Sequence, residues 1–139
     1  MADTSLGFRF RYRECQAPPT ILPLVCKATA TLTKGDLVNL ESSEIDLAAT
    51  NDNALVGVVL ETKAGVDSTT IYLVIVDDDA VYGVYDPNAR AIGATLDIAG
   101  TTGAMTVASS SNVDLMVVAN SSASEETLVK IAHGEHFKN

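Results

Sequence analysis

Apolar residues in this chain occur in short runs, and residues that favour turns, mainly Gly, Asn, Asp and Ser, separate these runs. Helix signals are weak, because no stretch of about a dozen residues keeps apolar positions at i, i+3, i+4 and i+7. The runs are rich in Thr, Val, Ile and Leu, a composition that favours β-strands. Many short strands at this spacing predict an all-β fold, either a small barrel or a sandwich. We expect strands at Ala28–Thr33, Leu37–Leu40, Ala54–Thr62, Thr69–Val76, Ala80–Tyr85, Thr95–Ile98, Met105–Ala108, Leu115–Ala119 and Thr127–His133.

The pattern also contains a faint internal repeat with a shift of 58 residues. Under this shift Gly35 falls on Gly93, and apolar positions fall on apolar positions. The apolar pairs are Val38 with Leu96, Leu40 with Ile98, Leu47 with Met105, Ala49 with Val107, Leu55 with Val113, Val59 with Val117, Ile71 with Val129 and Leu73 with Ile131. A duplication predicts two similar β-units packed as one domain, since repeat arrays usually need three or more units. The alternative is a chance alignment of strands with similar spacing.

Residues 1–27 differ from the rest and predict an extended N-terminal arm in front of a β-barrel domain at 28–139. Aromatic residues alternate with arginines in the arm. Because successive side chains of a strand point to opposite faces, the aromatics share one face and the arginines the other. Three prolines follow within six residues, which favours extended backbone and excludes a central strand of a sheet. The alternating residues are Phe8, Arg9, Phe10, Arg11, Tyr12 and Arg13.

Charge divides the chain at nearly the same place. Residues 1–34 hold five bases and two acids, a net of +3, whereas residues 35–139 hold four bases and sixteen acids, a net of −12. The total of −9 over 139 residues argues against general nucleic-acid binding, which needs basic surface against phosphate. A basic front end therefore precedes a strongly acidic body.

Two interpretations of the arm remain open at this point. In the first, Phe8–Arg13 leaves its own body and docks on another chain, because aromatics and arginine dominate interface hot spots and arginine pairs well with carboxylates. In a homo-oligomer, basic arms and acidic bodies would be complementary. In the second, Phe8–Arg13 is an ordinary first strand, with its aromatics in the core and its arginines outside.

No constellation of residues points to catalysis, a metal or a cofactor. His133 and His136 lie near the C-terminus, and we interpret them as solvated tail residues. Asp77–Asp79 lacks the spacing of a calcium loop and is interpreted as a hairpin loop of acids. The serines form no nucleophile elbow, and the glycines follow neither the P-loop nor the dinucleotide pattern. We therefore expect a protein that is not an enzyme and holds no cofactor.

The two cysteines, Cys15 and Cys26, match no zinc or redox motif. Two buried thiols are favoured over a disulfide that closes a short loop. No apolar run approaches the roughly 18–20 residues that span a bilayer, and the N-terminus lacks the pattern of a signal peptide. We expect neither a membrane span nor a membrane partner.

Several blocks of the chain, in this order, resemble the small decoration, or cement, proteins of tailed-bacteriophage capsids. One of them begins with the turn and strand Lys34–Leu40. The resemblance covers residues 28–133. The blocks are Ala30–Leu40, Ala48–Val59, Thr70–Val74, Ala91–Ile98, Asn112–Val118 and Thr127–Ile131.

The resemblance implies a β-tulip or β-barrel body without cofactor or catalysis, on the outer surface of the virion. It implies a homotrimer at three-fold and quasi-three-fold positions that binds the major capsid protein and stabilises the mature head by bridging capsomers. Phe8–Arg13 would then be the partner-binding residues. The alternative function is a small carbohydrate-type binding module, which the polar loops Asn51–Asn53 and Gly100–Gly103 favour and the absence of tryptophan opposes.

Overall fold

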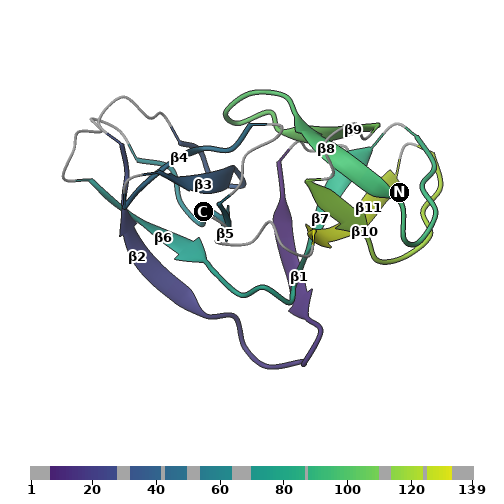
Figure 1. Ribbon diagram of the computed structural model, residues 1–139, viewed down its shortest axis with the longest axis horizontal. Helices are drawn as coiled ribbons and strands as arrows, with labels where there is room; N and C mark the ends of the chain where they lie inside the picture. Colours follow the sequence, from purple (N-terminus) through teal and green to yellow (C-terminus); the bar gives the residue numbers. More distant parts are fainter. Residues whose placement is uncertain are drawn as a thin grey trace.

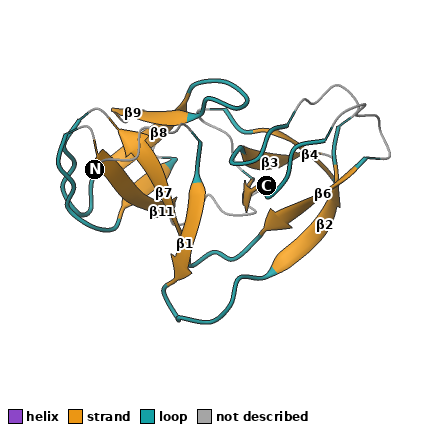
Figure 2. Cartoon of the chain, turned by 180° about the vertical axis from the view of Figure 1, so that it is seen from behind, coloured by secondary structure: helices purple, strands orange, loops and turns teal. Residues whose placement is uncertain are grey.

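The computed structural model describes residues 7–27, 32–41, 43–49, 54–63, 70–86, 88–109, 114–123 and 125–132 (Figure 1). Within these residues the chain is all-β, as the sequence predicts, and Figure 2 shows strands joined by loops without a helix. The described part accordingly holds no helix that could cross a membrane. The strands are β1 (Arg9–Arg13), β2 (Ile21–Val25), β3 (Leu37–Glu41), β4 (Glu44–Leu47), β5 (Leu55–Val58), β6 (Ile71–Ile75), β7 (Ala80–Asp86), β8 (Thr95–Ala99), β9 (Thr106–Ser109), β10 (Leu115–Val117) and β11 (Glu125–Ile131).

The strands form three antiparallel sheets rather than the closed barrel that the sequence led us to consider. A six-stranded sheet has the order β1-β7-β11-β10-β8-β9, a three-stranded sheet has the order β4-β3-β5, and β2 pairs with β6. Most predicted strands are present with bounds that differ by a few residues. Of the strand expected at Ala28–Thr33, the described residues Leu32 and Thr33 lie outside any strand, and the other four are outside the described residues.

Strand β4 is absent from our sequence prediction. Its sequence contains Glu44 and Asp46, two residue types that are depleted in strands. Its neighbour β3 nevertheless supplies a full antiparallel ladder, with Val38 opposite Leu47 and Leu40 opposite Ile45. Pairing with β3 thus stabilises β4 although the residues of β4 have a low intrinsic propensity for strand structure.

Around Gly35 and Gly93 the backbone hydrogen bonds follow the same 58-residue shift as the sequence pattern. Gly35 N–H donates to the carbonyl oxygen of Val59 at 2.9 Å, and Gly93 N–H donates to that of Val117, also at 2.9 Å. Both glycines have positive φ, 94° and 86°, a conformation that glycine adopts without steric cost.

The strand registers repeat as well. Val38 lies opposite Gly57 in the pair β3–β5, and the residues 58 positions later, Leu96 and Leu115, lie opposite each other in β8–β10. The domain therefore consists of two halves, in which equivalent strands have equivalent neighbours. We call the five strands from β2 to β6 the first half and the five strands from β7 to β11 the second half.

The 58-residue shift does not hold at β6 and β11. Leu60 N–H donates to the carbonyl oxygen of Leu73 and Val118 N–H to that of Leu128, so Leu73 corresponds to Leu128. The predicted pairing of Leu73 with Ile131 is therefore wrong.

The larger of two apolar clusters holds the halves together, and β5 contributes to both clusters. Leu55 and Val58 pack in the larger cluster, which also contains residues of the second half, whereas Val56 packs in the smaller cluster of the first half. This position explains why every residue of β5 is buried. Gly57 lies where β5 passes the backbone of Ile75 so closely that a Cβ atom would lie 1.6 Å from its carbonyl oxygen.

Proline is tolerated in β2 because, within the described part of the chain, that strand pairs on one side only. Pro23 lies opposite Leu73 of β6. The N–H groups of Val76 and Cys26 bond across this pair to the carbonyl oxygens of Thr20 and Thr70. Because backbone groups alternate in direction along a strand, Pro23 faces the outer edge of β2, where no N–H is needed. The prediction that these prolines do not lie in a central strand of a sheet is confirmed.

Candidate functional site: the N-terminal strand and its contacts

The aromatic and arginine residues form β1, which is the edge strand of the six-stranded sheet of the same chain. Arg9 lies opposite Gly83 and Phe10 opposite Tyr82 of β7. The register then shifts, so that Tyr12 lies opposite Val81 and Arg11 is the additional residue of a β-bulge. The segment 7–27 is therefore part of the fold, and an arm that stands apart from the domain is not what these described residues form.

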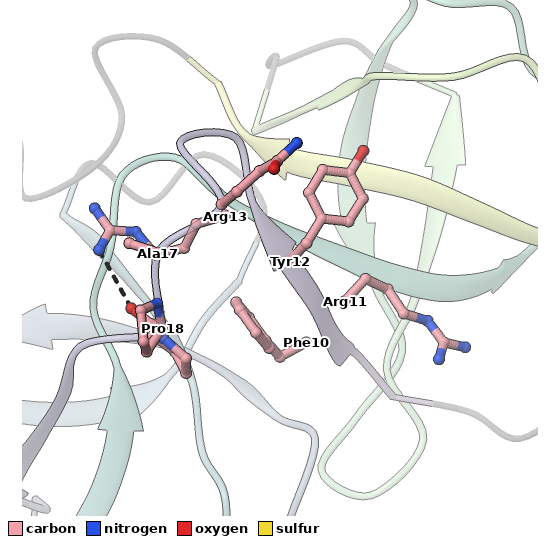
Figure 3. A pocket seen from close by; sticks show the side chains of 8 residues that line it. Phe10, Arg11, Tyr12, Arg13, Ala17 and Pro18 are labelled. Atoms are coloured by element: carbon pink, nitrogen blue, oxygen red, sulfur yellow. Dashed lines mark hydrogen bonds between the residues drawn. The ribbon is translucent and has the colours of Figure 1, made fainter.

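The bulge explains why the expected aromatic face is only partly correct. Phe8 is 1% exposed and packs in the larger core cluster. Phe10 is half-buried, with its ring 6.4 Å from that of Tyr82 in an edge-to-face arrangement. Beyond the bulge the alternation is shifted by one residue, and Tyr12 is 43% exposed. Figure 3 shows Phe10 and Tyr12 on opposite sides of β1.

The start of β1 lies between the two halves. The N–H of Gly7 donates to the carbonyl oxygen of Met105 in the second half, and the N–H of Phe8 donates to that of Gly35 in the first, both at 2.8 Å. The buried Phe8 side chain and these two bonds make the beginning of β1 a connection between the halves.

Two of the three arginines bind one carboxylate on a strand that is not adjacent to β1. Arg9 Nη2 donates to Glu126 Oε2 at 2.7 Å, and Arg11 Nε donates to Glu126 Oε1 at 2.8 Å. Arg11 Nη2 also donates to Glu126 Oε2. Glu126 belongs to β11, so its side chain crosses β7 to reach β1.

This crossing requires Gly83 in the intervening strand. A Cβ atom at Gly83 would lie 2.3 Å from Cδ of Glu126. The missing side chain therefore leaves the space in which the carboxylate meets both arginines. We call Arg9, Arg11, Gly83 and Glu126 the arginine–glutamate cluster.

The electrostatics of the cluster favour the ionised carboxylate. Burial by itself would raise the pKa of Glu126, but hydrogen bonds from Arg11 and Arg9 and their positive charges outweigh it, so the pKa lies below its usual range. The cluster is only partly shielded from water, since the side chains of Arg9, Arg11 and Glu126 are 28%, 41% and 21% exposed.

The third arginine binds the acidic segment Asp77–Asp79, which connects β6 to β7. Arg13 Nε donates to Asp79 Oδ1 at 2.8 Å, and Arg13 Nη1 lies 3.4 Å from Asp77 Oδ1. The carboxylates also accept from backbone N–H groups, Asp79 from Cys15 at 3.2 Å and Asp77 from Thr20 at 2.6 Å. Hydrogen bonds from Cys15 and Arg13 lower the pKa of Asp79 to about 2.

The interpretation of Asp77–Asp79 as a hairpin loop is wrong. The two strands that it connects lie in different sheets, because β6 pairs with β2 and β7 pairs with β1 and β11. The acids instead hold the chain where it leaves β1 and turns toward β2. Among the described residues no group of three or more His, Cys, Asp and Glu side chains could hold a metal ion.

All three arginines of β1 thus bind carboxylates of their own chain. The second interpretation of Phe8–Arg13, a first strand of the domain, describes their position in the structure. Docking of these six residues on another chain stays a prediction, and the parts of β1 that are exposed for it are the side chains of Tyr12 and Arg11.

A groove of about 650 Å³ lies between β1 and the turn that follows it. Phe10 and Tyr12 contribute from the strand, and Ala17, Pro18 and Pro19 from the turn. In Figure 3 a hydrogen bond from Arg13 to the carbonyl oxygen of Pro18, at 3.3 Å, crosses one end of it. The groove offers an apolar surface beside Arg11 and Arg13.

The remaining sequence candidates have structural roles or lie outside the described residues. Cys15 and Cys26 are not joined in a disulfide, and the expectation that both are buried is wrong for Cys15, which is exposed. His133 and His136 lie outside the described residues, as does the polar loop Asn51–Asn53.

The other polar loop, Gly100–Gly103, is bound to a buried side chain of the first half. Asp36 is fully buried and accepts from Thr102 Oγ1 at 2.5 Å and from Gly103 N–H at 2.9 Å. The same carboxylate accepts from the N–H of Thr33 at 2.8 Å. At this loop, polar groups that favoured the hypothesis of a carbohydrate-binding module thus form hydrogen bonds within the chain.

Gly83 and Glu126, which determine how β1 is held, were not among the residues predicted from the sequence. Their separation from Arg9 is 74 and 117 positions, so no local pattern connects them. An unexplained glycine inside a run with strand character was the one available signal, because such a glycine often marks a close approach of another group.

No protein-family model and no curated protein sequence matches the chain. A solved structure, the head fiber gp8.5 N base of bacteriophage phi29, is similar with a TM-score of 0.51 and 17% sequence identity. The match covers 86% of this chain and 100% of that chain. This protein therefore has a fold that is also found in the base of a bacteriophage head fiber.

Proposed function

We propose that this protein is a structural component of a bacteriophage head that binds the outer surface of the mature capsid as a homotrimer and stabilises it by bridging capsomers. The observation that carries the proposal is the likeness of fold to the head fiber base, which extends over the whole of that chain. The proposed role involves no catalytic step and no cofactor. The proposed partners are the major capsid protein and further copies of this chain.

The structure supplies properties that suit such a role. A net charge of −9 opposes nonspecific aggregation of the protein before it reaches the capsid. The N-terminal segment is held to the body by Phe8, by the arginine–glutamate cluster and by Asp77 and Asp79. A rigid single unit of this kind can transmit load between the capsomers that it contacts.

Stabilisation would follow from binding to one state of the head. A protein that binds the expanded shell and not its precursor stabilises the expanded state by mass action. Many copies with several contacts each make detachment rare, since all contacts of a copy must break together.

The test is co-sedimentation of the purified protein with expanded and unexpanded heads of the phage that encodes it. We expect binding to expanded heads and a higher temperature of DNA release from decorated heads than from bare heads. Heads that neither bind the protein nor gain heat resistance would contradict the proposal. Heat-denatured protein, sedimented with the same heads, is the control that shows whether binding depends on the native fold.

A further inference from the structure

One buried carboxylate of the first half is bound by a loop of the second half. Asp36, the residue before β3, is 0% exposed. It accepts a hydrogen bond from the N–H of Thr33 in its own turn, at 2.8 Å. It also accepts from Thr102 Oγ1 and from the N–H of Gly103, at 2.5 Å and 2.9 Å. Both donors lie in the β8–β9 loop, which in Figure 1 extends from the second half toward the first. Two of these three hydrogen bonds therefore join the halves.

The same loop holds the beginning of β1. Met105, at its end, is fully buried, and its carbonyl oxygen accepts from the N–H of Gly7 at 2.8 Å. Its Sδ accepts from the N–H of Leu37 at 3.1 Å. Next to these contacts, the N–H of Phe8 donates to the carbonyl oxygen of Gly35 at 2.8 Å. The turn before β3, the β8–β9 loop and the start of β1 thus meet at one place.

The internal duplication shows that the turn does not itself need this carboxylate. In the first half the N–H of Asp36 donates to the carbonyl oxygen of Thr33 at 2.9 Å. In the second half, 58 positions later, the N–H of Ala94 donates to that of Ala91 at 3.0 Å. The second half therefore forms an equivalent turn with alanine in the place of aspartate. The additional role of the Asp36 side chain is its contact with the β8–β9 loop.

The contacts of the loop favour a closed arrangement. A carboxylate is costly to bury unless hydrogen bonds compensate for its lost hydration. If the β8–β9 loop moved away, Asp36 would lose the bonds from Thr102 and Gly103. The N–H groups of Gly7 and Leu37 would lose their acceptors on Met105 in the same movement. Because these contacts break together, the closed arrangement is stabilised by their sum.

We propose that Asp36 and the β8–β9 loop form a latch that closes the two halves on the beginning of β1. The latch consists of Asp36, Thr102, Gly103 and Met105. It is a conformational device of a single copy and does not rest on the proposed function. While the latch is closed, Phe8 stays between the halves. Docking of Phe8–Arg13 on another chain would require these residues to leave β7, and the latch opposes that release.

The latch and the arginine–glutamate cluster hold different parts of β1. The cluster binds Arg9 and Arg11 within the strand, whereas the latch acts at Gly7, before the strand begins. Segments of a folded protein can open locally without global unfolding. A weakened latch is therefore expected to expose the start of β1 while the sheets remain formed.

The experiment measures amide hydrogen exchange of the full chain by NMR. The N–H groups of Gly7 and Phe8 report on the latch, and the N–H of Gly93, which donates to Val117 in the second half, is the internal reference. The latch variants are Asp36→Asn and Thr102→Val. Thr102 is half-buried, so Thr102→Val removes the hydroxyl donor with little risk to the fold. Circular dichroism and urea unfolding establish that each variant is folded.

The matched control is Asp114→Asn. Asp114 is also a buried aspartate, at 1% exposure, and its carboxylate accepts from the N–H of Ile98 within the second half, at 3.0 Å. The control therefore makes the same chemical change at a similar depth and leaves the β8–β9 loop contact with Asp36 intact. It separates opening of the latch from general destabilisation of the domain.

We expect each latch variant to accelerate exchange at Gly7 and Phe8 by about tenfold relative to Gly93, the loss expected for a shielded hydrogen bond to a carboxylate. Asp114→Asn should leave this ratio as in the wild type. Should Asp36→Asn fail to fold, Thr102→Val decides the question alone. An unchanged ratio in folded Thr102→Val, or an equal rise with Asp114→Asn, would overturn the proposal.

Discussion

Replacement of Glu126 by Gln tests how β1 is held. The wild-type carboxylate accepts three hydrogen bonds from Arg9 and Arg11. A Gln side chain keeps one acceptor oxygen, brings an amide group toward a guanidinium and removes the negative charge between two positive ones. The variant therefore loses the bidentate contact with Arg11 while the two cations remain close together.

The size of the effect depends on exposure. Hydrogen bonds to charged groups contribute about 1.5–3 kcal/mol when they are well shielded, whereas exposed ion pairs contribute about 0.2–1 kcal/mol. The side chains are between 21% and 41% exposed, which places the cluster nearer the lower range. We expect Glu126→Gln to lower the free energy of unfolding by about 0.5–1 kcal/mol, or Tm by about 2–4 °C for a chain of this size.

The assay is urea and thermal unfolding followed by circular dichroism, with hydrogen exchange at the amides of β1. Glu125→Gln is the matched control: it makes the same chemical change one residue earlier, at an exposed position on the same strand. Both variants remove one negative charge, so a general charge effect cancels between them. Equal stability of the two variants, or unchanged exchange in β1, would refute the assignment of Glu126 as the residue that holds this strand.

Three further changes have defined expectations. Gly57→Ala should cost about 3 kcal/mol, measured by urea unfolding, because its Cβ would meet the backbone oxygen of Ile75 at 1.6 Å; a near-neutral result would contradict the close approach. Phe8→Ala should cost about 3–5 kcal/mol in the same assay, since the side chain is 1% exposed in the core; a cost below about 1 kcal/mol would indicate a strand that is only loosely attached. Asp79 has a pKa of about 2 instead of 3.8, so its ionised form adds stability above about pH 4 that is lost as the pH falls toward 2. Asp79→Asn should reduce this loss, as measured by the urea midpoint between pH 6 and pH 2, and equal acid sensitivity of both proteins would refute it.

The sequence predicted the strands better than the contacts between them. Short apolar runs with turn residues at their ends were enough for most strands, and the glycines at Gly35 and Gly93, which are 58 positions apart, make corresponding backbone hydrogen bonds. The alternation from Phe8 to Arg13 predicted a strand, which the structure has as β1, but the separation of aromatics and arginines onto two faces holds only up to the bulge. Local pattern carries this information because it depends on neighbours in sequence.

The partners of β1 could not be predicted, because they depend on packing between distant residues. Glu126 reaches Arg9 across another strand, and only the absence of a side chain at Gly83 permits it. The bulge at Arg11 is equally invisible in the sequence, and it turns Tyr12 away from the core face on which strict alternation placed it. The basic N-terminal segment suggested an arm for another chain, and the acids that bind its arginines are in the same chain.

A protein built from two similar β-units has an equivalent edge strand in each unit. The unpaired backbone groups of an edge strand can bind strands of other chains and so cause aggregation. In this protein the two edges end in different ways. The second half closes its edge with β1, which needs Gly83 so that Glu126 can cross and hold the arginines. In the first half Pro23 corresponds to Gly83, because their cross-strand partners Leu73 and Leu128 correspond. A proline on an edge removes a donor that a further strand would use. Glycine at position 23 would restore that donor and leave an aliphatic edge open to the β1 segment of another copy. The glycine in the second half therefore permits β1 to be held against β7, and the proline in the first half removes a backbone donor from the outer edge of β2.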